Sequence, residues 1–440
     1  MKKEYPVLIA IFLISFLVKF LFLQQFPHIP GVDSGYYVWH VDETLEGDIF
    51  LDDPPFVFFL SALFSFLFND TIISVKIVIV LLSSLYVLPF YLIVKEITNN
   101  EKLGVFAALI GTFSGANWWV ALGHVKNIAG LLFGLFVIYY FILCMKNFSR
   151  KNAVLLALSF LFMVGSHFSS SAYMVAPLMA AAFLILSFVL YTKSNENARN
   201  VCIALILFSF LVATSIIVLK PSLIGDSTIG TIGLQEESNT KFSPIKQGEL
   251  FRISILEHYS IFSILALLGL YVLWRQNKEL FILFSIWIFT SLLFTQPAFV
   301  DARWVLRFEM MSFLPFTILC ITGLNFFESK PLLYSIMFLL FIFTTFDFLN
   351  TLNDPKMVIS NNTYFQLVAF HGSNPDITVY CTMMPECYWF HAIGFEVIDG
   401  QPEPPFEDGD FLAIKNKQPG IRVGDYTFVP LDKKPLRPMP

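Results

Sequence analysis

Long apolar runs recur along most of this chain of 440 residues and decide what it can fold into. A run of about 20 apolar residues matches the roughly 30 Å hydrocarbon core of a bilayer. Only an α-helix or a closed barrel satisfies its backbone polar groups there, and runs of this length favour helices. The pattern predicts about eleven spans, at residues 6–24, 72–94, 103–121, 128–145, 153–165, 171–191, 201–219, 257–274, 279–296, 304–325 and 332–349. The sequence therefore predicts a polytopic α-helical membrane protein.

Composition excludes two other classes of protein. The chain is 56% hydrophobic, contains 51 Phe and has a mean hydropathy of +0.69, values that a soluble globule does not reach. Its net charge of −5 argues against a nucleic acid partner, because binding to phosphate backbones needs a basic face. Lys2 and Lys3 precede the first span as in a signal peptide, but no small-residue cleavage site follows. We therefore expect a retained membrane anchor.

Basic residues alternate between successive connections and predict the orientation. With a cytoplasmic amino terminus, every short cytoplasmic connection carries Lys or Arg, as the positive-inside rule requires. These residues are Lys2, Lys3, Lys95, Lys102, Lys146, Arg150, Lys151, Lys193, Arg199, Arg275, Lys278 and Lys330. The first outer loop, 25–55, has none. The outer side then receives loops 25–55 and 220–256 and the whole tail, and we expect a multi-pass protein of a prokaryotic plasma membrane.

Two segments differ from the spans. The apolar stretch 56–68 follows Pro54-Pro55 and is too short to cross, so we expect a helix lying at the membrane interface within a membrane domain of residues 1–349. Residues 350–440 contain short apolar runs separated by Pro, Gly and acidic clusters, which predicts a small extracytoplasmic α/β domain with a helix over 357–371. Cys381 and Cys387 of this tail could pair if it faces an oxidising space, or remain free.

The first outer loop holds seven acidic residues and no Lys or Arg. Asp33 and Tyr37 are four residues apart, so they share one face if this stretch is helical. A carboxylate beside aromatic rings at a membrane surface suits a general base acting on a hydroxyl group. Gly-Val-Asp-Ser is also a helix-start signal, and Asp33 could equally be a helix cap.

Two arginines mark the start of the apolar run near residue 304. Arg303 and Arg307 are spaced i, i+4 and lie at its outer end, so both could clamp the phosphate of a membrane lipid with planar guanidinium groups. The alternative is that they reach lipid headgroups, or pair with Glu309 or Asp301. Two arginines and Glu309 so close together favour the clamp.

Short outer turns supply further candidates. His124 and Lys126 follow the third span and His167 follows the fifth, and together they could complete a phosphate or sugar site. A single histidine at a membrane edge can equally be a hydrogen-bonded structural residue. The acids, Asp52 and Asp53 among them, could hold Mg²⁺ or Mn²⁺ with waters, although acids in such a loop are usually only solvated. No metal-ligand spacing of the His/Cys type occurs, and we predict no protein metal site.

Taken together, these features resemble the GT-C glycosyltransferases, especially the protein O-mannosyltransferases and the aminoarabinose transferase of bacterial lipid A. The shared features are one span, an outer loop with an early Asp-x-x-x-Tyr, a Pro-Pro doublet before an interfacial helix, many spans and a final ectodomain. The resemblance implies transfer of a sugar, with inversion, from a polyprenyl-phosphate donor to an acceptor on the outer face. It implies that Asp33 is the base and that Arg303 and Arg307 hold the phosphate, where we also place Lys126.

The chain departs from the family pattern at three places. Ser34 follows Asp33 where a second acid is common, Asp53 precedes the Pro doublet where His or Lys is common, and the turn after the third span offers His124 instead of an acid. The residues expected to line the substrate site are Tyr37, Asp52, Asp53, His124, His167 and Glu309. Two other functions remain open: a non-catalytic transporter or flippase of lipid-linked sugars, and a polysaccharide polymerase or ligase using loop 220–256.

Overall fold

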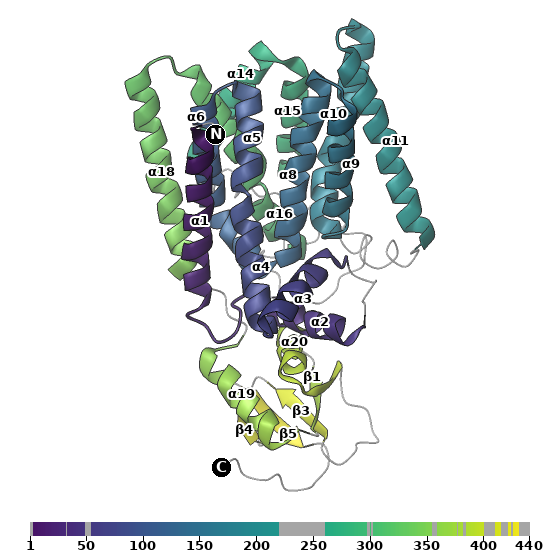
Figure 1. Ribbon diagram of the computed structural model, residues 1–440, viewed down its shortest axis with the longest axis vertical. Helices are drawn as coiled ribbons and strands as arrows, with labels where there is room; N and C mark the ends of the chain where they lie inside the picture. The colour runs from purple at the N-terminus through teal and green to yellow at the C-terminus, as the bar shows by residue number, and fades with distance from the viewer. Residues whose placement is uncertain are drawn as a thin grey trace.

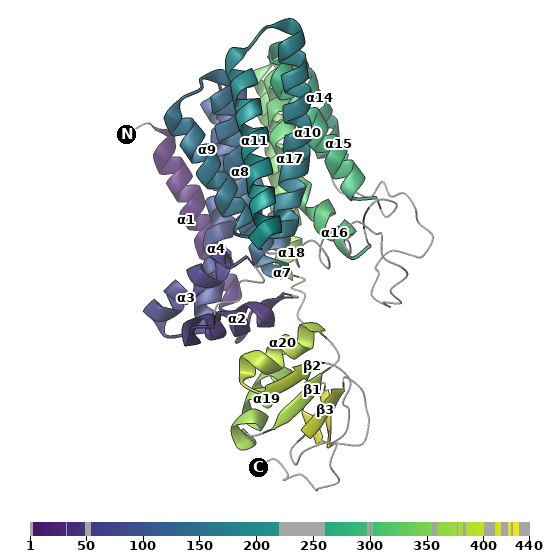
Figure 2. The same cartoon turned by 90° about the vertical axis from the view of Figure 1, so that its right-hand side faces the viewer.

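The protein is a helical bundle with a small mixed α/β domain at one end (Figures 1 and 2). The computed structural model describes residues 3–31, 33–48, 54–219, 260–296, 300, 302–353, 359–375, 377–381, 384–399, 410–414, 421–423 and 426–430. The helices of the bundle are α1 (Glu4–Leu23), α4 (Thr71–Leu85), α5 (Val87–Thr98), α6 (Glu101–Thr112), α7 (Gly115–Gly123), α8 (Val125–Lys146), α9 (Arg150–Val164), α10 (Phe168–Thr192), α11 (Glu196–Leu219), α14 (Ser260–Gln276), α15 (Lys278–Phe294), α16 (Ala302–Met311), α17 (Phe313–Gly323) and α18 (Lys330–Asn353).

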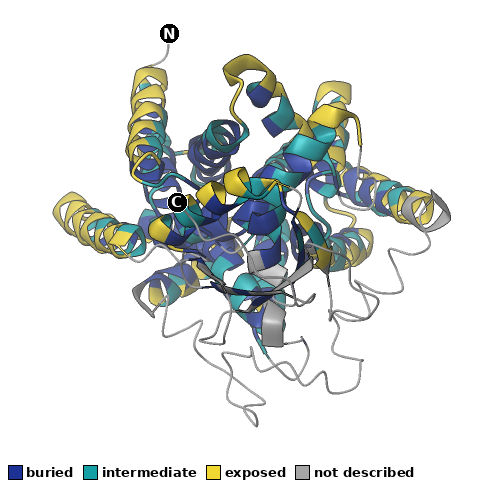
Figure 3. Ribbon diagram, turned by 90° about the horizontal axis from the view of Figure 1, so that it is seen from below, coloured by how far each residue is buried: buried dark blue, intermediate teal, exposed yellow. Residues whose placement is uncertain are grey.

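Each of the eleven predicted apolar spans coincides with helix over most of its described residues, and the predicted fold class is confirmed. Among the described residues, seven helical stretches are long and apolar enough to cross a bilayer, and the bent pair α6–α7 makes an eighth. The other three predicted spans correspond to the helices α9, α14 and α15, which have 15 to 17 residues. Seen from below, exposed residues face outward at the edge of the bundle and buried ones fill its centre (Figure 3). The chain is thus an integral, multi-pass membrane protein.

The predicted span 103–121 is broken, and a buried lysine lies at the break. Helices α6 and α7 meet at an angle of 45°. The Nζ atom of Lys19, which interrupts the apolar run of α1, donates to the carbonyl oxygens of Ser83 at 3.2 Å and Thr112 at 3.1 Å. Thr112 is the last residue of α6, whose final carbonyl groups have no partner within the helix. The hydrogen bond from Lys19 gives one of these carbonyl groups a partner, so Lys19 stabilises the break.

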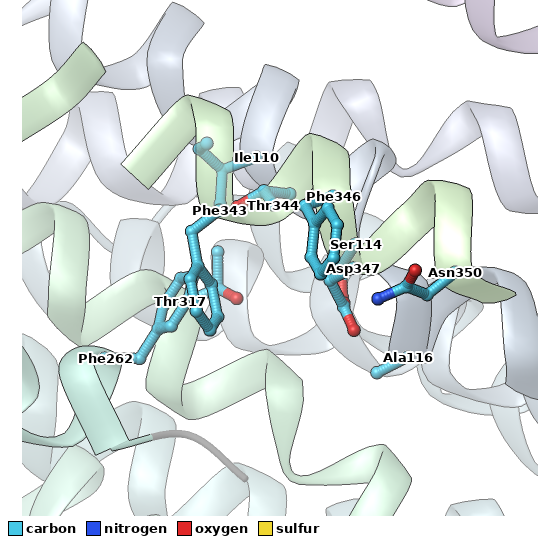
Figure 4. Close-up of a pocket in the computed structure, with 10 residues that line it drawn as sticks. All are labelled: Ile110, Ser114, Ala116, Phe262, Thr317, Phe343, Thr344, Phe346, Asp347 and Asn350. Carbon is cyan, nitrogen blue, oxygen red and sulfur yellow. The ribbon is translucent and has the colours of Figure 1, made fainter. Parts of the chain in front are cut away.

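An acidic side chain lies at the other side of this break. The carboxylate of Asp347 on α18 accepts a hydrogen bond of 2.9 Å from the backbone N–H of Gly115, the first residue of α7. A negative charge at a helix N-terminus is favourable. Asp347, Ser114 and Asn350 line a cavity of about 260 Å³ beside the break (Figure 4). The two side chains therefore fix the start of α7, a short helix that ends next to the candidate site.

Two short helices separate the bundle from the C-terminal domain: α2 (Ser34–Glu46) and α3 (Phe56–Phe68) (Figure 1). Helix α3 covers the segment that we expect at the membrane interface, and Leu63, Phe66 and Leu67 on it are exposed. These are the side chains that would enter the lipid, and the interfacial position stays a prediction.

The C-terminal domain is built around a five-stranded sheet. Its strands are β1 (Thr378–Cys381), β2 (Glu396–Asp399), β3 (Asp410–Ile414), β4 (Ile421–Val423) and β5 (Tyr426–Pro430), in the order β2-β1-β3-β5-β4. Strand β1 pairs in parallel with β2 and β3, whereas β5 is antiparallel to β3 and β4. Helix α19 (Asn361–Ser373) lies close to the predicted 357–371, but α20 (Met384–Ile393) was not predicted. Cys381 and Cys387 form a disulfide that joins β1 to α20.

Helix α20 packs directly on α2. At Gly35 a Cβ atom would lie 2.8 Å from the backbone nitrogen of Trp389, so the two helices approach as closely as glycine permits. The rings of Trp39 and His391 stack at 4.2 Å, and the buried ring of His28 meets the Trp389 ring edge-on at 5.2 Å. The C-terminal domain therefore rests on the helix that begins immediately after Asp33.

Candidate active site

Asp33 and His124, distant in sequence, form a hydrogen-bonded pair. Asp33 immediately precedes α2, but its side chain makes no capping hydrogen bond to that helix. Its Oδ2 atom instead lies 2.9 Å from Nδ1 of His124, in the turn between α7 and α8. The His124 side chain is 6% exposed and that of Asp33 is 27% exposed. Of the two interpretations of Asp33, helix cap or site carboxylate, the geometry favours the second.

The backbone before Asp33 fits tightly against the end of α7. Gly31 has φ +130°, a conformation that side-chain-bearing residues rarely adopt, and a Cβ atom there would lie 2.0 Å from the carbonyl oxygen of Leu122. The hydroxyl of Ser34 then donates to the carbonyl oxygen of Gly31 at 2.8 Å. This approach brings the loop to the turn that carries His124.

Arg307 extends the pair to a third charged group. Its guanidinium nitrogen Nη2 lies 3.9 Å from Oδ2 of Asp33, and its side chain is 27% exposed. Helix α16, which carries Arg307, packs against α7. The predicted phosphate-binding arginine and the predicted base are therefore neighbours.

Lys126 lies on aromatic rings beside this cluster. Its Nζ atom is 4.9 Å from the centre of the Tyr36 ring and 5.4 Å from that of Phe58, both within cation–π range. Its backbone N–H donates to the hydroxyl of Tyr37 at 3.3 Å. Lys126 and Tyr37 are both buried. Tyr37 lies near the start of α2, the helix whose N-cap residue is Asp33.

Nearby charges change the ionisation of the pair. Burial alone would raise the pKa of the Asp33 carboxyl, but the charge and hydrogen bond of His124 and the charges of Arg307 and Lys126 outweigh it, and the pKa is lowered below 3.8. For His124, burial and then the charge of Arg307 lower the pKa below 6.5, although Asp33 acts in the opposite sense. The pair is thus an ionised carboxylate bonded to a neutral imidazole at pH 7.

The remaining predicted residues are placed differently. His167 caps α10, because its Nδ1 atom accepts a hydrogen bond of 3.3 Å from the backbone N–H of Ser170. Burial, followed by the charges of Lys126, Arg307 and His124, lowers the pKa of His167 well below 6.5. His167 therefore interacts electrostatically with these three residues. Glu309 is buried on α16.

Three predicted residues cannot be placed in the site. Asp52 and Asp53 lie outside the described residues, and Arg303 belongs to α16 but its side chain is outside them as well. Within the part of the chain that the structure describes, no three His, Cys, Asp or Glu side chains gather in a way that could hold a metal ion.

Aromatic residues of the site were missed by sequence reasoning. The ring of Trp119 meets the His124 ring edge-on at 5.6 Å, and Tyr36 lies under Lys126. The doublets Tyr36-Tyr37 and Trp118-Trp119, each a few residues from a charged candidate, were the available signal.

Two comparisons with known proteins found matches, one to a family profile and one to solved structures. Residues 52–216 match the family profile described as dolichyl-phosphate-mannose-protein mannosyltransferase. No curated protein matches the sequence.

Solved structures match over most of the chain. ArnT from Cupriavidus metallidurans bound to undecaprenyl phosphate is 12% identical with a TM-score of 0.63, covering 92% of this chain and 87% of that one. The apo state of the same protein gives 10% identity, a TM-score of 0.64 and coverage of 90% and 86%. The Archaeoglobus fulgidus oligosaccharyltransferase in complex with Zn and sulfate is 12% identical, with a TM-score of 0.61 and coverage of 89% of this chain.

This chain spans only 62% of the length of the archaeal enzyme. At such low identity the likeness establishes the fold, and the partial family match agrees with it. The resemblance inferred from the sequence is therefore confirmed at this level: the chain has the fold of the GT-C membrane glycosyltransferases.

Proposed function

We propose that this protein transfers a sugar, such as a hexose, from a polyprenyl-phosphate donor to a hydroxyl acceptor on the extracytoplasmic face. The observation that carries the proposal is the contact of Asp33 with both His124 at 2.9 Å and Arg307 at 3.9 Å. An acid–base pair and a phosphate-binding guanidinium then lie side by side. The undecaprenyl phosphate bound to the structurally similar ArnT supports this donor class.

The proposed reaction makes two demands on the site. The acceptor oxygen forms a bond to the anomeric carbon as the bond from that carbon to the phosphate oxygen breaks, and attack from the opposite side inverts the configuration. Negative charge then grows on the leaving phosphate, where Arg307 and Lys126 stabilise it. The proton of the acceptor hydroxyl passes to the Asp33–His124 pair. The family resemblance implies Asp33 as the base, and the geometry offers the imidazole of His124 as a second candidate.

A buried and aromatic setting makes these charges effective. Lys126 and His124 are buried, so charge interactions there are weakened less by water than on an open surface. Arg307 and Asp33 each retain partial exposure, which leaves both groups accessible to substrates. The acids of loop 25–55 could hold Mg²⁺ or Mn²⁺, so activity is to be measured with and without each ion.

A transporter of lipid-linked sugars is the main competing function. Transporters bind substrate at broken helices near the middle of the membrane, and α6–α7 is such a broken helix. Here, however, Lys19 binds the carbonyl end of α6 and Asp347 binds the amide end of α7, so the helix ends at the break have protein partners. The cluster around Asp33 lies at the far end of α7, which favours an enzyme.

A donor screen tests the proposal. Purified protein in proteoliposomes is incubated with polyprenyl phosphates carrying mannose, glucose or aminoarabinose, together with an extract of envelope lipids and proteins. Mass spectrometry follows free polyprenyl phosphate and sugar-modified products. We expect one donor to be cleaved and its sugar transferred. Binding of every donor without cleavage would instead indicate a carrier.

A further inference from the structure

Three features of His124 suit it to act as a general base. Its Nδ1 atom is engaged by Asp33 at 2.9 Å. Its Nε2 atom forms no hydrogen bond within the described part of the chain. Its ring makes an edge-on contact with Trp119. Its backbone N–H donates a hydrogen bond of 2.8 Å to the carbonyl oxygen of Val120, which holds the backbone of the turn. The second nitrogen is therefore fixed and available.

The ionisation states decide the direction of the hydrogen bond. Asp33 is surrounded by His124, Arg307 and Lys126 and is ionised, so its Oδ2 atom accepts and Nδ1 of His124 donates. Burial and Arg307 keep the imidazole neutral at pH 7. A neutral imidazole that donates from Nδ1 carries its lone pair on Nε2. This is the arrangement by which a carboxylate orients a histidine base and stabilises the imidazolium that forms.

The competing base is the carboxylate itself. Its Oδ2 atom is bonded to His124 and lies near Arg307, and three neighbouring cationic or hydrogen-bonding groups stabilise its anionic form. A carboxylate stabilised in this way has a low proton affinity. The Nε2 atom of His124, by contrast, has no hydrogen-bond partner among the described residues, so its lone pair can accept a proton from the acceptor hydroxyl.

We propose that His124, through Nε2, takes the proton from the acceptor hydroxyl, and that Asp33 orients His124 and stabilises its charge. This inference rests on the proposed glycosyl transfer. As the acceptor oxygen bonds to the anomeric carbon, its proton moves to Nε2, and the electron pair of the breaking carbon–oxygen bond leaves with the phosphate held by Arg307. The imidazolium then returns its proton to water. Burial and Arg307 disfavour protonation of the ring before the reaction. His167 is the other histidine nearby, and the charges of His124, Lys126 and Arg307 all act on it.

Two substitutions separate a base from a positioning residue. In His124→Asn the amide nitrogen occupies the place of Nδ1, so the hydrogen bond to Asp33 persists but Nε2 is lost. In His124→Gln the amide nitrogen occupies the place of Nε2 but cannot take a proton. A catalytic base predicts that both variants lose about 10²–10⁴-fold in kcat, with donor KM changed little. A positioning role predicts that the Asn variant keeps most of its activity and only the Gln variant loses it.

The assay uses whichever polyprenyl-phosphate sugar the wild-type protein cleaves in the screen above, and binding of the spent polyprenyl phosphate reports that each variant is folded. The pH profile of Asp33→Asn provides a second test. With His124 as base, the residual kcat of this variant still falls on the acid side, because the imidazole still titrates, whereas with Asp33 as base that fall disappears. Activity of His124→Asn within about fivefold of wild type, or residual activity of Asp33→Asn without an acid-side fall, would overturn the inference. Absence of donor cleavage by the wild-type protein would instead refute the proposed function.

Discussion

Replacing Gly31 by alanine tests whether the close approach of the first loop to α7 positions the catalytic pair. A Cβ atom at residue 31 would lie 2.0 Å from the carbonyl oxygen of Leu122, and real Cβ atoms essentially never come closer than 3.0 Å. The loop must therefore withdraw by about 1 Å, because its neighbour is backbone rather than a flexible side chain. Such a withdrawal moves Asp33 away from His124, and a misplacement of about 1 Å can cost roughly 10²-fold in rate. We expect Gly31→Ala to lower kcat by about that factor.

Gly47→Ala is the matched control. Gly47, at the other end of α2, has φ +101°, so alanine introduces backbone strain of a similar kind, about 1–3 kcal/mol. No atom lies within 4 Å of the Cβ that would be added, so nothing has to move. Both variants should lose some thermal stability in detergent, but only Gly31→Ala should lose turnover of the donor. If the two variants have the same kcat, the contact with Leu122 does not position the site.

Three further predictions follow from the site and the topology. Asp33→Asn, nearly equal in shape, should lower turnover by about 10²–10⁴-fold with donor binding little changed, and full turnover in a folded variant would remove Asp33 from the mechanism. Arg307→Ala should weaken binding of polyprenyl phosphate by roughly 10–100-fold, since a hydrogen bond to a charged group contributes about 1.5–3 kcal/mol, and Arg307→Lys should restore it only in part. An unchanged lipid affinity in Arg307→Ala would exclude the clamp. Cysteines introduced at Thr44 and Asp408 should react with an impermeant thiol reagent from outside the cell. Cysteines at Asn152 and Asn277 should not react, and labelling of Asn152→Cys from outside would show that the predicted orientation is wrong.

The helical bundle could be predicted because burial in lipid depends mainly on the length and composition of each run. The break between α6 and α7 could not, since residues 103–121 are mostly apolar, and small or polar residues like Ser114 and Gly115 occur in the unbroken spans as well. Lys19 was seen as an interruption of the first span, but its partners at residues 83 and 112 come from other helices. The role of such a lysine depends on which helix ends pack around it, and this follows from the tertiary structure, not from the local sequence.

Several residues of the candidate site could be proposed from the sequence, but their arrangement could not. Asp33 and Arg307 were predicted as a base and a phosphate ligand, roles that stay predictions, and nothing local links Asp33 to a histidine 91 positions away. That contact depends on Gly31 meeting the end of α7 and on the turn at His124. His167 was predicted to belong to the site because it lies in an outer turn. In the structure its side chain also caps α10. Helix α20 was missed because residues 384–393 mix aromatic and polar side chains without a clear helical period.

A structure of this protein with undecaprenyl phosphate bound tests the central claim most directly. The account predicts that the lipid phosphate lies within hydrogen-bonding distance of the Arg307 guanidinium, near Lys126, with space for a sugar beside the Asp33–His124 pair. A phosphate found away from these residues, for example in the cavity lined by Asp347 and Asn350 at the start of α7, would contradict the assignment of the active site.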